Sequence, residues 1–133
     1  PEMKDGVLIE HSHRMLGTTI GAMTVLLAIG LWRRREGLGK LGALAVLAVS
    51  VQGLLGGLTV LYRLPTWVST SHLGLSMLFL ALLLFIIVRL GDRRVALSAA
   101  TQRAAGIGAI VVYAQLILGA YVRHAGAGLE HAR

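Results

Sequence analysis

Seven charged or titratable residues lie at the ends of long apolar segments. They are Glu10, His11, His13, Arg14, His72, Arg123 and His124. Ionisable groups at membrane depth are costly and therefore mark functional sites by default. Neutral imidazole is a good ligand for iron, and a carboxylate can act as a base. This set of residues predicts metal or proton chemistry at one end of the molecule.

The composition predicts that these residues are held by helices within a membrane. The 133-residue chain is 56% hydrophobic and 14% charged, against roughly 25% charged residues in ordinary soluble domains. No cysteine is present, which excludes disulfides and thiolate metal sites. The chain opens on a polar segment that lacks the pattern of a signal peptide.

Four segments contain no charged residue and are long enough to cross a bilayer: Met15–Trp32, Leu41–Tyr62, Leu64–Val88 and Ala104–Val122. They predict an all-α protein, a single integral membrane four-helix bundle formed by residues 1–133. The expected helices cover about 8–32, 41–62, 71–90 and 104–122. The 64–67 segment is expected to form a turn because it contains Pro65.

The distribution of basic residues predicts the orientation of the chain. Eight lie in the two connections expected inside: Arg33, Arg34, Arg35, Lys40, Arg89, Arg93, Arg94 and Arg103. The connection between the second and third helices holds only Arg63. By the positive-inside rule, both termini face the outer, periplasmic side. Because topology accounts for these bases, we expect no binding of nucleic acid.

His13 and His72 are expected at similar depth. His13 lies 19 residues before Trp32, and His72 lies 16 residues before Val88, which correspond to about 28 and 24 Å of helix. In an up-down bundle the first and third helices lie diagonally across the core. The two imidazoles could therefore ligate one heme iron, although each could instead be a hydrogen-bonded core residue. Zinc is a weaker alternative because His11 and His13 point in different directions.

Other residues near this end have two interpretations each. Glu10 and Arg14 are spaced to form an ion pair, whereas Glu10 could also orient His13 or act as a base. Arg14 and Arg123 could bind heme propionates, whereas Arg123 could simply extend to the lipid headgroups. The pairs Gly17/Gly21 and Gly53/Gly57 predict close helix packing, or alternatively a bed for a flat cofactor.

Four segments resemble the heme A synthase family. Ile9-Glu10-His11-Ser12-His13-Arg14 is similar to the E-x-x-H-R sequence that opens the second helix of the family. Gln52-Gly53-Leu54-Leu55-Gly56-Gly57-Leu58 resembles the Q-x-x-x-G segment of its third helix. Ser71-His72-Leu73 resembles the start of the fourth, and the 119–129 segment the end of the fifth. The resemblance thus covers one shifted four-helix repeat, roughly residues 8–130.

The resemblance implies a function and roles for individual residues. Members have eight helices in two halves and oxidise a methyl group of heme O to the formyl group of heme A. When the roles of the family's residues are carried over by position, the resemblance implies that His13 and His72 are the two axial ligands of the heme iron. It also implies that Glu10 assists the oxidation. Arg14 matches the motif arginine, and Arg123 and His124 match a segment without an assigned role. One histidine pair implies one heme site, holding heme b or heme O.

These observations predict a multi-pass oxidoreductase of the bacterial plasma membrane. The expected partners are membrane lipid, heme O, a second copy or the other half of a longer protein, and a heme O synthase or terminal oxidase. One alternative is a non-enzymatic b-type heme protein for electron transfer or structure. A proton-coupled transporter is less favoured because Glu10 lies far from the midplane.

Overall fold

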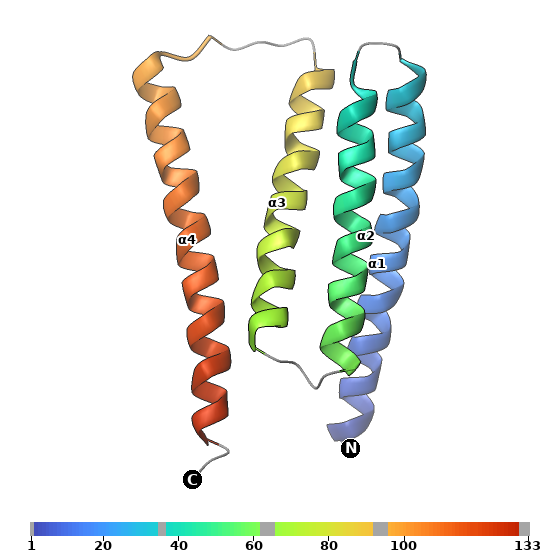
Figure 1. The fold of residues 1–133 in the computed structure, drawn as a ribbon, viewed down its shortest axis with the longest axis vertical. Helices are drawn as coiled ribbons and strands as arrows, with labels where there is room; N and C mark the ends of the chain where they lie inside the picture. The colour runs from blue at the N-terminus through green and yellow to red at the C-terminus, as the bar shows by residue number, and fades with distance from the viewer. Residues whose placement is uncertain (1, 35–36, 62–65, 92–95, 131–133) are drawn as a thin grey trace. The chain divides into compact units, whose positions relative to one another are not determined.

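The described residues form four long α-helices and no strand. The computed structural model describes residues 2–34, 37–61, 66–91 and 96–130. The helices are α1 (Glu2–Arg33), α2 (Gly39–Leu61), α3 (Thr66–Leu90) and α4 (Ala99–Glu130). All four are long and apolar enough to cross a membrane. The predicted all-α class is confirmed, as are four helices whose length and composition allow them to cross a membrane (Figure 1).

The chain divides into two compact units, residues 1–53 and residues 54–133. In the first unit, the chain reverses between α1 and α2 at Gly37, whose φ of 73° lies in the left-handed region that favours glycine. Leu38 is buried, and its carbonyl accepts hydrogen bonds from the amides of Leu41 and Gly42. This turn directs α2 back along α1 (Figure 1).

At Gly42, α2 lies in close contact with α1. A Cβ atom at Gly42 would lie 2.9 Å from Ala28 Cα and 3.2 Å from Ala28 Cβ. The nearest atom is backbone, which a side-chain rotation cannot move aside. Small residues allow such approach between helices in a bilayer, where packing rather than water drives association.

We expect Gly42→Ala to destabilise the protein by about 1–3 kcal/mol, because the added methyl group forces the two backbones apart. Gly30→Ala is the matched control: no described atom of the first unit lies within 4 Å of the Cβ position there. The control is expected to be neutral or stabilising by up to about 1 kcal/mol. Unfolding by denaturing detergent, followed by circular dichroism, measures both. Equal stability of the two variants would contradict the contact.

In the second unit, α3 and α4 contact each other through the first half of α3. A Cβ atom at Gly74 would lie 2.8 Å from Ile117 Cδ1 and 3.0 Å from Tyr113 Oη. The helices separate toward the connection at residues 91–98 (Figure 1). Accordingly, every residue from Ala99 to Val112 is exposed. The contact between α3 and α4 therefore lies at the end of α3 that carries His72.

Hydroxyl groups within the helices are mostly satisfied by the backbone of the same helix. The Thr18, Thr24 and Ser50 hydroxyls donate to the carbonyls of Arg14, Ile20 and Val46 at 3.0, 2.7 and 2.8 Å. In lipid no water replaces such bonds. These polar side chains are therefore compatible with membrane-spanning helices.

The helices extend beyond the predicted bounds. The 71–90 prediction began too late, because α3 starts at Thr66 and the predicted turn residues Thr66 and Trp67 are helical. The 104–122 prediction was too short: Ser98 caps α4, its Oγ accepting a hydrogen bond from the Thr101 amide at 3.1 Å. Tyr62, the predicted end of the second helix, lies outside the described residues.

The close packing predicted for two glycine pairs is not found within either unit. No described atom of its own unit lies within 4 Å of the Cβ position of Gly17, Gly21, Gly53 or Gly57. Among the described glycines, the tight contacts are instead at Gly42 and Gly74, and Gly56 is in ordinary van der Waals contact with His72. The four-residue spacing marks a smooth face on one helix, but it does not determine whether a neighbouring helix covers that face.

Candidate functional site

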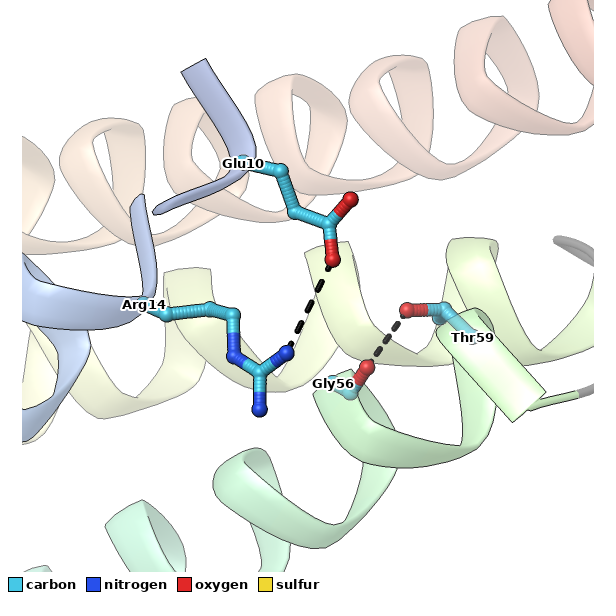
Figure 2. A network of polar contacts seen from close by, with 4 residues as sticks. All are labelled: Glu10, Arg14, Gly56 and Thr59. Atoms are coloured by element: carbon cyan, nitrogen blue, oxygen red, sulfur yellow. Dashed lines mark hydrogen bonds and ion pairs between the residues drawn. The ribbon is translucent and has the colours of Figure 1, made fainter. Parts of the chain in front are cut away.

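Glu10, His13 and Arg14 lie together on α1, in the first unit. The three residues are exposed and share one side of the helix because they are three and four residues apart. Arg14 Nη1 lies 3.7 Å from Glu10 Oε1, so the ion pair allowed by the spacing is present (Figure 2). The side chains of Arg14 and Glu10 are 70% and 51% exposed. A long ion pair with such exposure is weak, which leaves the carboxylate available to other groups.

Two glycines follow His13 on the same side of α1 and form what we call the Gly17/Gly21 strip. Gly17 and Gly21 follow His13 at intervals of four residues and therefore lie on the same side of the helix. Within the first unit, no described atom fills the space beside either glycine. His13 therefore shares one side of α1 with two residues that carry no side chain. This shape suits a flat ring system ligated at His13.

His72, near the start of α3, packs against Gly56 of α2 within the second unit. A Cβ atom at Gly56 would lie 3.4 Å from His72 Cε1 and 3.9 Å from His72 Nδ1. The imidazole edge therefore lies directly against the α2 backbone. The carbonyl of Gly56 accepts a 2.6 Å hydrogen bond from the Thr59 hydroxyl (Figure 2). The His72 carbonyl likewise accepts a hydrogen bond from the Ser76 hydroxyl at 3.0 Å.

Two buried hydroxyl groups lie close to His72 in the sequence of α3. Ser69 Oγ and Thr70 Oγ1 are buried and have no hydrogen-bond partner in the described part of the chain. Ser69 precedes His72 by three residues and lies on the same side of α3. Buried polar atoms normally have partners, so these hydroxyl groups are available to a polar group that binds beside them. Sequence reasoning did not identify Ser69.

Arg123 lies at the same end of the second unit as His72. The contact between Gly74 and Ile117 places these two residues at the same height in the antiparallel pair of α3 and α4. His72 lies two residues before Gly74, and Arg123 lies six residues after Ile117. At 1.5 Å per residue, Arg123 is about 6 Å nearer than His72 to the end of the unit. Its side chain is exposed. The side chain of His124 lies outside the described part of the structure.

The histidines and carboxylates near the proposed site suit heme iron better than a metal ion bound by side chains alone. Among the described residues, no group of three or more His, Cys, Asp or Glu side chains is placed to hold a metal, and zinc requires about four ligands, or three with one open position. A bis-imidazole heme requires only two histidines. In the first unit, the Gly17/Gly21 strip beside His13 offers space for a flat ring. In the second unit, the Ser69 hydroxyl near His72 and the exposed Arg123 are groups that can bind carboxylates.

Gly56 is the contact that sequence reasoning missed. The resemblance singled out the 52–58 segment, and the two glycine pairs directed attention to Gly53 and Gly57 instead. The available signal was the motif itself, because Gly56 is the glycine of the Q-x-x-x-G sequence. That glycine provides the space for the His72 imidazole.

Comparison with known proteins shows which family the chain is similar to. The COX15-CtaA family model, described as "Cytochrome oxidase assembly protein", matches residues 2–132. The heme A synthases of Alkalihalophilus pseudofirmus and Halalkalibacterium halodurans are each 32% identical over 131 residues, 92% of this chain and 44% of the relative. The heme A synthase of Symbiobacterium thermophilum is 32% identical over 97% of this chain and 47% of its own length. No solved structure matches.

The chain therefore spans slightly less than half the length of these curated relatives. The family match covers nearly all of the chain and includes every motif that carried the resemblance. Together with four helices able to cross a membrane, it identifies a multi-pass membrane protein. The chain belongs to the heme A synthase family, a family of oxidoreductases of heme A biosynthesis.

Proposed function

We propose that this chain forms a heme site of the heme A synthase type, at which a methyl group of heme O is oxidised to the formyl group of heme A. The observation that carries the proposal is the Glu10-x-x-His13-Arg14 sequence on one exposed side of α1, directly above the open Gly17/Gly21 strip. This arrangement combines a ligand, a base and a flat surface on one helix.

His13 and His72 are proposed to hold the iron. Imidazole nitrogen is a strong axial ligand, and two such ligands leave no open position for dioxygen at that iron. When bound, the heme supplies the methyl group to be oxidised or, as heme b, a one-electron redox centre. Packing against Gly56 restricts the orientations that the His72 ring can adopt. Ring orientation is a recognised means of tuning metal ligands.

Arg14, Arg123 and His124 are proposed to bind the carboxylate side of the heme. A guanidinium forms paired hydrogen bonds with a carboxylate. Arg123 lies beyond His72 toward the end of the second unit, where charged propionate groups have access to the membrane surface. The unpaired Ser69 hydroxyl supplies an additional donor near His72.

Glu10 is proposed to act as the base for the methyl oxidation. Its carboxylate lies three residues before His13 on the same side of α1, so it belongs beside the ring rather than in the iron coordination shell. The partner Arg14 holds it at 3.7 Å without enclosing it. The conversion R–CH3 + H2O → R–CHO + 4 H+ + 4 e− would take its oxygen from water and pass its electrons to an external redox partner, and the half-exposed Glu10 carboxylate would accept protons.

The proposed location is the bacterial plasma membrane, with the heme site and both termini on the outer side. The distribution of bases, eight in the 33–40 and 89–103 regions against Arg63 alone, supports this orientation. The proposed partners are a second copy or the other half of a longer protein, and a heme O synthase or terminal oxidase.

The proposal is tested by expressing the full chain in membranes supplied with heme O and identifying the extracted hemes by mass. We expect heme A in membranes that contain the chain and none in membranes without it. Bound heme without any formyl product would favour the second candidate, a non-enzymatic b-type heme protein. The specific observation in favour of that candidate is that these residues supply one proposed axial pair, His13 and His72, and therefore one heme site.

Gly56 substitutions should test whether the α2 backbone orients His72. Gly56→Ala places the new Cβ at ordinary contact distance from the imidazole, 3.4 and 3.9 Å, so the low-spin heme spectrum should be unchanged. Gly56→Leu has no room and should change the spectrum and lower heme occupancy about tenfold or more. Gly57→Leu, beside an open position, is the matched control. An unchanged spectrum in Gly56→Leu would contradict the assignment.

A further inference from the structure

An apolar groove between α1 and α2 lies at the end of the first unit opposite to His13. It has a volume of about 440 Å³ and is lined by Val25, Ile29 and Trp32 from α1 and by Ala43 and Val46 from α2. The groove exists because Gly42 and Ala28 bring the helix backbones together, leaving the larger side chains to form its walls. Neither the heme site nor the family motifs use these residues.

The groove ends at a cluster of positive charge. Arg33 lines its mouth, and the exposed Arg34 and Lys40 lie on either side of the turn that joins the two helices. The 33–40 segment contains four bases and one acid, Glu36. An apolar occupant that carries a negative group at one end would match both parts of this surface.

The dimensions agree with a membrane lipid. Val25 and Arg33 are eight residues apart, about 12 Å along the helix. One leaflet contributes about 15 Å of hydrocarbon, half of the bilayer core. The groove therefore extends over most of one leaflet, and its basic mouth lies where phosphate groups are found. Trp32 at the mouth is also typical of the membrane interface.

We propose that this groove is a selective binding site for an anionic phospholipid. One acyl chain lies between α1 and α2 along Val25, Ile29 and Val46. The phosphate and its anionic headgroup are bound by Arg33, Arg34 and Lys40. The proposal concerns the α1–α2 pair alone and is independent of the heme chemistry.

Trp32 provides a direct probe, because the chain has only two tryptophans and Trp67 can be replaced. The full-length Trp67→Phe variant is placed in bilayers containing brominated phosphatidylglycerol or brominated phosphatidylcholine, which quench tryptophan on contact. We expect tighter binding of the anionic lipid at Trp32, by roughly five-fold for each base that contacts it. In the matched Trp32→Phe variant, Trp67 should show no preference between the lipids.

Two further variants distinguish lipid binding in the groove from simple attraction of anionic lipid to the basic 33–40 segment. Ala43→Phe fills the groove and should abolish the preference while all bases are retained. Arg33→Gln with Lys40→Gln should also abolish it, whereas Arg103→Gln, a base on α4, should not. Circular dichroism checks that each variant is folded. Equal quenching by both lipids, or a preference that persists in Ala43→Phe, would overturn the proposal. Shielding of Trp32 from both lipids that disappears on dilution would also overturn it, since a second copy would then cover the groove.

Discussion

His72→Ala and His13→Ala are each expected to abolish the low-spin heme absorption of the purified protein. Each is also expected to lower the heme content per chain by about tenfold or more. Each change removes one of two proposed axial ligands, and one imidazole cannot maintain the six-coordinate iron. The measurement is the absorption spectrum together with the heme content per chain, after circular dichroism has shown that the helices are intact.

His11→Ala is the matched control for the histidine variants. His11 is exposed, as His13 is, but it lies two residues away and therefore on another side of α1. It should retain the full spectrum. If His13→Ala and His72→Ala also retained it, neither residue would be a ligand. A spectrum lost equally in all three variants would indicate damage to the protein rather than loss of a ligand.

Glu10→Gln is expected to retain bound heme and to lower formyl formation per bound heme by about 10²- to 10⁴-fold, the usual contribution of a general base. The amide keeps the size of the side chain but cannot accept the proton. The measurement is the ratio of heme A to heme O extracted from the purified protein. Glu10→Asp, which keeps the carboxylate on a shorter side chain, should recover part of the activity.

Arg14→Gln separates this role from the simpler one of neutralising a charge. The variant breaks the 3.7 Å ion pair and leaves the carboxylate in place. If Glu10 served only to pair with Arg14, both variants would have the same effect on formyl formation. We expect Arg14→Gln to weaken heme binding, with turnover per bound heme reduced much less than in Glu10→Gln. Equal turnover in Glu10→Gln and the unmodified chain would exclude Glu10 as the base.

The apolar segments predicted the helices well because lipid imposes a simple requirement on the sequence. A stretch of about 20 residues without charges has few alternatives to a helix in a membrane. The same criterion underestimated helix length. The helices α1 and α4 extend past His13 and Arg123 into charged sequence, because charge limits the depth of a residue in lipid and not its helical conformation.

The contacts between helices were harder to predict than the helices themselves. Gly17 and Gly21 have the expected spacing, yet Gly42, which has no partner glycine four residues away, makes the close contact with Ala28. The Gly56–His72 contact joins residues 16 positions apart in sequence. Periodicity describes a single helix, whereas contact depends on how two helices face each other. The site residues of α1, by contrast, follow directly from helical spacing.

The central claim is that His13 and His72 share one heme iron, and the electron paramagnetic resonance spectrum of the oxidised, purified chain tests it most directly. A low-spin signal of two imidazole ligands, at one heme for each pair of histidines, is the predicted result. A high-spin signal from iron with a single imidazole, or protein purified without heme from heme-replete membranes, would contradict it.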